Sequence, residues 1–138
     1  MENCVFCQIV KGEIPCYKVY EDENFLGFLD VRPLNPGNSL LIPKKHYRWT
    51  YDVSNFGEYW EAAKKVALLS LKVVKASSVN FYTIGEEVFH AHIRIIPRFP
   101  NDGHVNGINL SEIKQISQKD MKRIAQTIFQ EIKNSKKS

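Results

Sequence analysis

Apolar and chemically reactive side chains alternate along residues 88–98, where two histidines and an arginine stand at every second position. Successive side chains of a β-strand point to opposite faces, so the alternation predicts one strand with a chemical face and a core face. A single histidine in such a strand would be interpreted as a half-buried side chain that only hydrogen-bonds to backbone groups. Two histidines and an arginine on the same face favour a functional role for that face instead. We expect that face to carry His90, His92, Arg94 and Ile96, and the core face to carry Phe89, Ala91, Ile93 and Ile95.

Shorter apolar runs predict four further strands, at residues 17–20, 25–29, 40–42 and 79–84. The stretches between them are rich in proline, glycine and acidic residues, as turns and loops are. Pro33 and Pro36 lie in one such stretch, residues 30–37, where they remove ladder donors and disfavour helix.

Two segments show helical spacing instead. Apolar residues recur at three and four positions from residue 55 to about residue 74, with Ser54 as the expected N-cap. Ser117 and Asp120 form a capping-box pattern that predicts a second helix through Ile132. The apolar stripe of this second helix is interpreted as core packing and not as a cofactor site, and it consists of Met121, Ile124, Ala125, Ile128, Phe129 and Ile132.

This order of strands, helix, strands and helix predicts an α+β fold with a mostly antiparallel sheet and two main helices. The chain has 138 residues, of which 43% are hydrophobic, and can therefore bury one sizeable core. Residues 1–138 are expected to form a single domain.

Composition and charge exclude several classes of protein. The formal net charge of +4 is modest and no recognition-helix pattern occurs, so nucleic acid is not an expected partner. No signal peptide and no membrane-spanning run is recognisable, so a cytoplasmic location without membrane contact is expected. In that reducing compartment the odd cysteine count (Cys4, Cys7 and Cys16) argues against disulfides and leaves metal ligation or redox chemistry for Cys4-x-x-Cys7.

Seven short motifs follow one another between residue 4 and about residue 98: Cys4-x-x-Cys7, Glu13-Ile14-Pro15, Tyr20-Glu21-Asp22, Phe28-Leu29-Asp30, Pro36-Gly37-Asn38, Leu41-Ile42-Pro43-Lys44-Lys45-His46, and His90-Ala91-His92-Ile93-Arg94-Ile95-Ile96-Pro97-Arg98. Each motif alone is weak, but their order and spacing together resemble the histidine-triad (HIT) family of nucleotide hydrolases and transferases. The resemblance implies a HIT-like fold, a homodimer, and chemistry at a nucleoside phosphate.

The resemblance implies that His92, the middle histidine of the motif, attacks the α-phosphate and carries a transient nucleotidyl group. Imidazole suits this role, because its unperturbed pKa of about 6.5 leaves the neutral form abundant near pH 7. His90 would orient the site or bind metal. Arg94 stands where the family usually has a third histidine. An arginine cannot shuttle a proton at neutral pH, but its guanidinium can clamp phosphoryl oxygens.

A pocket for a purine nucleotide is also implied. Asp30 matches the family acid that accepts hydrogen bonds from ribose hydroxyls, and a lone carboxylate between an apolar strand and a proline loop needs a partner. Asn38, which replaces a histidine common after Pro-Gly, is assigned to the same pocket. Its apolar walls are assigned to Phe6, Ile9, Phe28, Leu29 and Val31, and ordinary core packing is the alternative for these residues.

Cys4, Cys7, His46 and His90 resemble a zinc site of many microbial members of the family. Zinc binds two thiolates and two imidazoles tetrahedrally, and a C-x-x-C pair supplies two ligands from one tight turn. Such a site would be structural, with no open position for catalysis, and would tie the N-terminus to the central strand. A surface thiol pair with an unrelated histidine is the alternative.

Two functions from different classes remain open. One is an enzyme that hydrolyses or transfers a nucleoside monophosphoryl group, from a phosphoramidate or a dinucleoside polyphosphate. The other is a nucleotide-binding or adaptor protein whose turnover has been suppressed by Arg94 and by the loop at residues 83–87. That loop is shorter than its family counterpart, and its Glu86 and Glu87 would repel phosphate.

Overall fold

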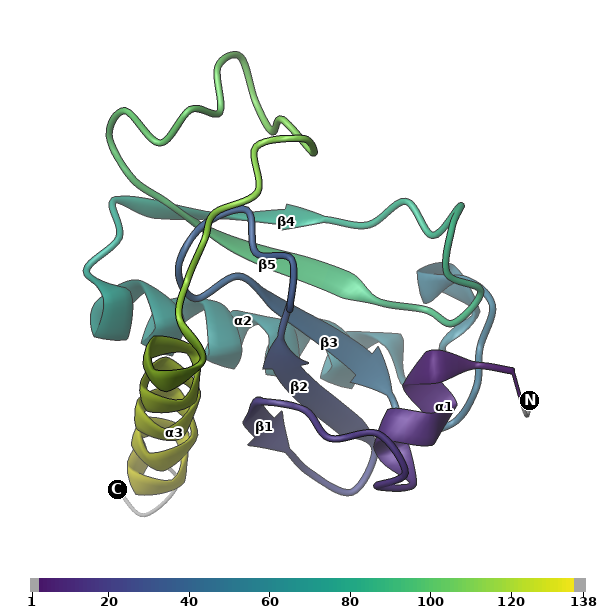
Figure 1. Ribbon diagram of the computed structural model, residues 1–138. Coiled ribbons are helices and arrows are strands. Elements are labelled where there is room, and N and C mark those ends of the chain that lie inside the picture. Colours follow the sequence, from purple (N-terminus) through teal and green to yellow (C-terminus); the bar gives the residue numbers. More distant parts are fainter. Residues whose placement is uncertain (1–2, 136–138) are drawn as a thin grey trace.

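One five-stranded antiparallel sheet organises the computed structural model, which describes residues 3–135 (Figure 1). All four neighbouring pairs of strands are antiparallel, in the spatial order β1-β2-β3-β5-β4. The α+β class is confirmed. The strands are β1 (Lys18–Glu21), β2 (Phe25–Leu29), β3 (Ser39–Pro43), β4 (Ser78–Tyr82) and β5 (Ile93–Arg98).

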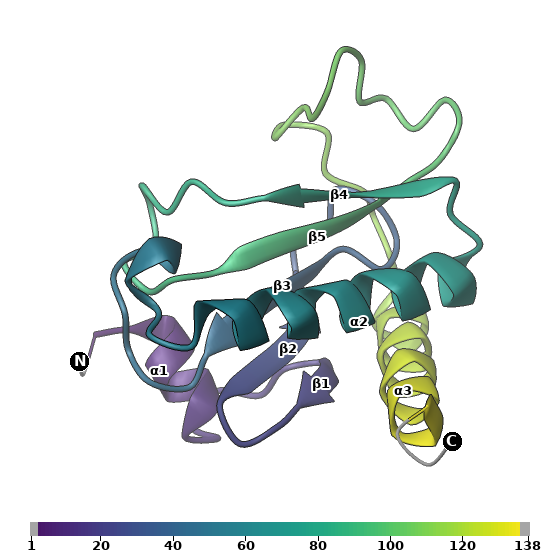
Figure 2. The ribbon, with the colours of Figure 1, turned by 180° about the vertical axis from the view of Figure 1, so that it is seen from behind.

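The helices cover the two faces of this sheet unequally. They are α1 (Val5–Val10), the short 3₁₀ helix η1 (Thr50–Asp52), α2 (Phe56–Val74) and α3 (Gln118–Ser135), and Figure 2 shows α2 lying along the sheet. One large apolar cluster joins the sheet to α2 and α3. A smaller cluster on the opposite face lies under α1. Alternation along β2 explains the division, because Phe25 and Leu29 enter the large cluster while Leu26 and Phe28 enter the small one.

The two main helices were predicted, but their ends differ in detail. Asn55 is the N-cap of α2 and makes no side-chain cap bond, whereas the Ser54 hydroxyl hydrogen-bonds the Tyr47 hydroxyl at 3.0 Å. The prediction of Ser54 as N-cap is therefore wrong. At α3 the Ser117 Oγ accepts a hydrogen bond from the Asp120 N–H at 3.1 Å, as the capping pattern predicts. The sequence pattern did not identify α1 as a helix.

The central strand is shorter than its alternation suggests. β5 pairs with β3 only from Ile93 onward, so His90 and His92 precede the strand. Ala91, Ile93 and Ile95 do enter the large cluster, as expected of the core face. The prediction for Phe89 is wrong, because its side chain is 59% exposed. It lies before the regular ladder, where the alternation of the strand no longer determines which way a side chain points.

The long loop after β5 is held by one nearly buried carboxylate. The side chain of Asp102 is 6% exposed and accepts hydrogen bonds from Arg98 Nε at 2.9 Å and Asn35 Nδ2 at 2.9 Å. The backbone N–H groups of Phe99 and His104 also donate to it, at 3.0 and 3.1 Å. The Arg98 guanidinium, assisted by these N–H groups, holds the pKa of Asp102 well below its usual range. The loop therefore depends on an ionised carboxylate.

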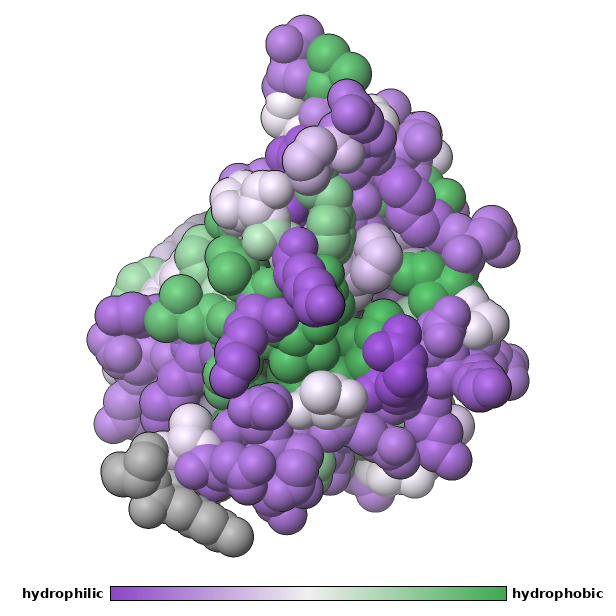
Figure 3. All heavy atoms as spheres, turned by 90° about the vertical axis from the view of Figure 1, so that its left-hand side faces the viewer, coloured by the Kyte–Doolittle hydropathy of each residue, from purple (hydrophilic) through white to green (hydrophobic). Residues whose placement is uncertain are grey.

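Outside the clusters, apolar side chains are distributed over several elements. Figure 3 shows the side on which α2 and α3 end, where apolar residues gather in the middle of a largely hydrophilic face. Leu68 on α2 is 57% exposed, and Val105 in the loop after β5 is 78% exposed. Within residues 3–135, no helix has the length and apolar character needed to cross a bilayer.

The Asp102 network leads to a prediction about stability and pH. Asp102→Asn should lower the free energy of unfolding by about 3 kcal/mol at neutral pH, because it leaves the Arg98 charge without its carboxylate. A carboxyl whose pKa is depressed by folding stabilises the fold above its unfolded pKa of about 3.9 and loses this effect as pH falls. Denaturant titrations should therefore show the gap between variant and wild type shrinking below about pH 4. A gap that stays constant down to about pH 3 would contradict a role for the charge.

Candidate functional site

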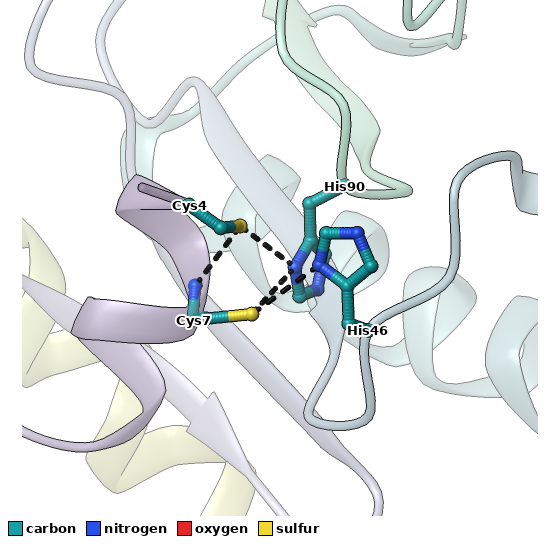
Figure 4. Close-up of side chains that lie close together, drawn as sticks. All are labelled: Cys4, Cys7, His46 and His90. Atoms are coloured by element: carbon teal, nitrogen blue, oxygen red, sulfur yellow. Dashed lines mark hydrogen bonds between the residues drawn. The ribbon is translucent and has the colours of Figure 1, made fainter. Parts of the chain in front are cut away.

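Two cysteines and two histidines from three separate segments converge beside α1 (Figure 4). Cys4 is the N-cap of α1, and its Sγ accepts a hydrogen bond from the Cys7 N–H at 3.3 Å. Cys4 Sγ lies 3.3 Å from His90 Nδ1, and Cys7 Sγ lies 3.3 Å from His46 Nδ1 and 3.5 Å from His90 Nδ1. One ligand atom from each residue lies within 4.8 Å of the others.

The spacing of these atoms fits a metal ion. Zinc bonds of about 2.3 Å to sulfur and about 2.05 Å to nitrogen, at tetrahedral angles, place the two ligand atoms about 3.6 Å apart. The three measured sulfur–nitrogen distances of 3.3, 3.3 and 3.5 Å are close to this value. His90 Nε2 donates to the Pro43 carbonyl oxygen at 2.8 Å, which leaves the lone pair of Nδ1 toward the sulfurs. The cluster could therefore hold a metal.

In His92 the ring nitrogen with a lone pair is Nε2, whereas in His90 it is Nδ1. The His92 Nδ1 lies 2.8 Å from the His90 carbonyl oxygen, which can only accept, so the proton is assigned to Nδ1 and Nε2 keeps a lone pair. The side chain is buried, and the Phe6 ring packs edge-on against the imidazole at 5.4 Å between centroids. Burial lowers the pKa of His92, and the Arg94 and Arg48 charges lower it further, against the opposing effects of the His90 carbonyl and Asp30. Near pH 7 the imidazole is neutral, with an available nucleophilic nitrogen.

His90 differs from its neighbour in its surroundings. It is fully buried, and burial lowers its pKa to about 4. Both of its ring nitrogens have partners, in the cysteine sulfurs and the Pro43 carbonyl. This arrangement suits a metal ligand and leaves no ring nitrogen to meet a substrate.

Asp30 and Arg94 form an ion pair beside His92. The distance from Arg94 Nη1 to Asp30 Oδ2 is 3.8 Å, and the two side chains are 29% and 11% exposed. Asp30 Oδ1 also accepts a hydrogen bond from the Arg32 N–H at 2.9 Å. Burial raises the pKa of Asp30, while the Arg32 N–H and the Arg94 charge oppose that rise. The carboxylate thus has the partner that the sequence called for.

The apolar residues assigned to a pocket separate into two groups. Phe6 and Phe28 pack edge-to-face at 5.7 Å, with Ile9 against the same small cluster, on the side where His92 lies. Val31 is 74% exposed. Leu29 belongs to the large cluster on the opposite face, so the structure does not bring it to this group.

Asn38 is buried and already hydrogen-bonded. Its Oδ1 accepts from the Leu34 N–H at 2.9 Å, and its Nδ2 donates to the Ile95 carbonyl oxygen at 3.3 Å. These contacts join the loop after β2 to β5. The structure does not place the Asn38 amide among the groups that face His92.

The sequence analysis missed a cleft of about 370 Å³ that His92 shares with Arg48, Trp49 and Tyr51. The aromatic run directly after His46 was the available signal. His104, to which the sequence analysis assigned no role, is buried, and both ring nitrogens are hydrogen-bonded: its Nε2 donates to the Leu34 carbonyl oxygen at 2.8 Å, and its Nδ1 accepts from the Asn109 N–H at 3.0 Å. Its position indicates a structural role.

Comparison with known proteins finds a family whose members this chain resembles. Residues 11–101 match the family model described as "HIT domain". The chain is 42% identical to an uncharacterized HIT-like protein of Borreliella burgdorferi over 113 residues, which cover 75% of this chain and 81% of that protein. It is 33% identical to the adenosine 5′-monophosphoramidase hnt1 of Schizosaccharomyces pombe over 139 aligned positions, covering 95% of this chain and 99% of that enzyme.

Among solved structures, the fold resembles a zinc-bound histidine triad family protein from Mycobacterium smegmatis. The TM-score is 0.74 at 27% identity, over 97% of this chain and 98% of that one. The expectation of a HIT-like fold is thereby confirmed.

Proposed function

This chain belongs to the HIT domain family, and on that premise we propose that it is a nucleotide hydrolase or transferase acting at the α-phosphate of a nucleoside phosphate derivative. The observation that carries the proposal is the hydrogen bond from His92 Nδ1 to the His90 carbonyl oxygen. It directs the lone pair of His92 Nε2 away from the backbone, as a nucleophilic imidazole requires. Phosphoramidates and dinucleoside polyphosphates are the proposed substrates. The first class is supported by the relative hnt1, which is named an adenosine 5′-monophosphoramidase.

The proposed reaction has two displacement steps. His92 Nε2 attacks the α-phosphorus, a phosphorus–nitrogen bond forms, and the leaving group departs with its bonding electrons and takes a proton from water. Water then attacks the same phosphorus, the phosphorus–nitrogen bond breaks, and nucleoside monophosphate is released with His92 neutral again. The His90 carbonyl stabilises the imidazole while it carries the nucleotidyl group, because it accepts a hydrogen bond from the Nδ1–H throughout.

We assign the nucleoside to the side of His92 where α1 covers the sheet. Phe6, Ile9 and Phe28 would contact a purine base there, and Asp30 would accept hydrogen bonds from the ribose hydroxyls. Val31 is accessible at the edge of this region. Leu29 and Asn38, which were assigned to the same pocket, would support it only indirectly, through packing and loop anchoring.

One observation favours the alternative of a nucleotide-binding or adaptor protein. Arg94 pairs with Asp30 and, as an arginine, cannot deliver a proton to a leaving group. A substrate phosphate would have to compete with that carboxylate for the guanidinium. Binding would survive this competition, while turnover would fall.

A homodimer and a cytoplasmic location complete the proposal. Strand β4 is an edge of the sheet, and its Phe81, 44% exposed, packs against Trp60 of α2 at 5.5 Å between ring centroids. With Phe56, 45% exposed, these rings form an aromatic surface suited to a second copy of the chain. Thiols that serve as metal ligands must stay reduced, which suits the cytoplasm.

We also propose that Cys4, Cys7, His46 and His90 hold a structural zinc ion. Two thiolates and two imidazoles complete a tetrahedral zinc shell and leave no position open for substrate. The ion would cross-link α1 to the segments that carry His46 and His90, and the zinc-bound relative supports this choice of metal.

The nucleophile can be tested by substitution. His92→Ala should lower turnover of adenosine 5′-phosphoramidate by at least about a thousandfold, because no other group replaces the attacking nitrogen, while AMP binding measured by calorimetry persists. Acid quenching of the wild type followed by peptide mass spectrometry should locate a nucleotidyl group on His92. Near-wild-type turnover by the variant, or an adduct on another residue, would rule out the assignment.

Arg94 distinguishes the enzyme from the binder. If its guanidinium stabilises charge in the transition state, Arg94→Ala should lower kcat about a hundredfold with a smaller change in nucleotide affinity. Arg94→His supplies the usual family residue as the comparison. An inactive wild type and an active histidine variant would favour the binder. Unchanged rate and affinity in Arg94→Ala would mean that Arg94 serves only the pair with Asp30.

The metal assignment predicts about one zinc per chain in protein purified without added metal. Changing Cys4→Ser and Cys7→Ser together should remove this metal and lower the Tm, because metal binding contributes to folding free energy. Cys16→Ser is the matched control, since this cysteine lies outside the cluster, and it should retain the full metal content. Elemental analysis and thermal melts provide both measurements, and a double variant that keeps its zinc would show that other residues bind it.

A further inference from the structure

The cleft beside His92 has no role in the reaction proposed above. It lies between the segment around η1 and the loop after β4, and it has a volume of about 370 Å³. His92 is one of its lining residues, so the cleft adjoins the proposed reaction centre. Its other lining residues include Arg48, Trp49, Tyr51, Gly85 and Glu86.

Three planar side chains that line this cleft, Arg48, Trp49 and Tyr51, take part in a stack of planar groups. The Arg48 Cζ lies 3.7 Å from the centroid of the Trp49 ring and 4.1 Å from that of Phe89, so the guanidinium packs against both rings. The Tyr51 ring continues the stack, 5.8 Å from Trp49 between centroids and within 7° of parallel. Tyr51 is 70% exposed. The stack therefore ends in an accessible aromatic surface.

The backbone holds this stack in place. Arg48 Nη1 donates to the Gly85 carbonyl oxygen at 2.6 Å, which fixes the guanidinium. Gly85 has φ +74°, a left-handed conformation that favours glycine, and a Cβ there would lie 3.5 Å from the Trp49 ring. The loop therefore lies against the indole, and the positive φ is what favours glycine at this position. An aromatic surface fixed before binding loses little entropy when a ring stacks on it.

We propose that this cleft binds the leaving group of the substrate and selects leaving groups that carry a planar aromatic ring. The proposal rests on the proposed function, because it requires the α-phosphorus at His92. An in-line displacement expels the leaving group away from the attacking nitrogen, and the nucleoside is assigned above to the side of His92 where Phe6 and Phe28 pack together. The cleft offers the leaving group a separate surface that ends at Tyr51.

Two charged side chains line the cleft with opposite signs. Arg48 is partly buried and fixed by the stack, whereas Glu86 is exposed and screened by water. The fixed charge is therefore positive, which suits a ring linked through phosphate. The same ring chemistry occurs in the second nucleoside of a dinucleoside polyphosphate and in the aromatic amine of a phosphoramidate.

The decisive measurement is a ratio of specificity constants. For wild type and Tyr51→Ala, kcat/KM is measured with diadenosine triphosphate, with the tryptamine phosphoramidate of AMP, and with unsubstituted adenosine 5′-phosphoramidate. Stacking of one base on an aromatic side chain predicts that Tyr51→Ala lowers the ratio of aromatic to unsubstituted substrate about tenfold. Phe129→Leu, on α3 at the other end of the molecule, should leave the ratio at its wild-type value (Figure 1).

The two aromatic substrates separate the sources of the ring. A loss for both assigns the cleft to aromatic rings of either kind, and a loss for diadenosine triphosphate alone assigns it to a phosphate-linked nucleoside. An unchanged ratio in Tyr51→Ala for both substrates would overturn the proposal. The high exposure of Tyr51 makes this variant safe for folding, which circular dichroism can verify.

A binding measurement tests whether the cleft binds the leaving group independently of whether the protein is an enzyme. The chain has two tryptophans, so a Trp60→Phe, His92→Ala double variant reports on Trp49 alone and cannot form the histidine adduct. Diadenosine triphosphate should quench the Trp49 fluorescence, and AMP, which fills only the nucleoside side, should not. Quenching by diadenosine triphosphate in this variant, together with a wild type that turns over none of the three substrates, would support the cleft while refuting the enzyme. Equal quenching by both ligands, or quenching by neither, would overturn the proposal that the cleft binds the leaving group.

Discussion

The two hydrogen bonds of His90 are the constraint on which the rest of the site depends. Its ring nitrogen Nε2 donates to the Pro43 carbonyl, and its own carbonyl accepts from His92 Nδ1, both at 2.8 Å. The first bond leaves Nδ1 for the cysteine sulfurs, and the second leaves His92 Nε2 for chemistry. One buried residue thereby sets the proton position on two imidazoles and leaves a different ring nitrogen with a lone pair on each. Its burial protects this arrangement, because a pKa of about 4 keeps the ring neutral near pH 7.

The cluster of Cys4, Cys7, His46 and His90 is connected to the proposed nucleophile, His92, through α1. Cys4 caps this short helix and Cys7 lies within it, next to Phe6. The Phe6 ring packs against both His90 and His92, with centroid distances of 5.8 and 5.4 Å. A helix of six residues has little stability of its own, so its position relies on these tertiary contacts. A metal at the cluster would therefore stabilise the packing around His92 while remaining outside the reaction.

Positive charge around His92 comes from two directions. Arg94 belongs to the strand and is balanced by Asp30, whereas Arg48 belongs to the segment after β3 and is held by aromatic rings and a neutral carbonyl. In the loop at residues 83–87, the carboxylates of Glu86 and Glu87 were expected to repel phosphate. The positive charge of Arg48 opposes this repulsion. Glu86 shares the cleft with Arg48, and the net field there depends on both side chains.

Local pattern alone determined much of this protein. The strand runs and the two long helices were predicted from period and residue type, which are local properties. The four residues able to bind metal were expected from the resemblance to the HIT family. Alternation also grouped His90, His92 and Arg94, although the regular strand begins only at Ile93. Only the tertiary structure decided which ring nitrogen each histidine presents, since the Pro43 carbonyl lies 47 residues from His90. It likewise decided that Leu29 faces the helices, that Asn38 is consumed by loop anchoring, and that Arg48, Trp49 and Tyr51 meet His92. These outcomes depend on contacts between distant segments, which no spacing along the chain specifies.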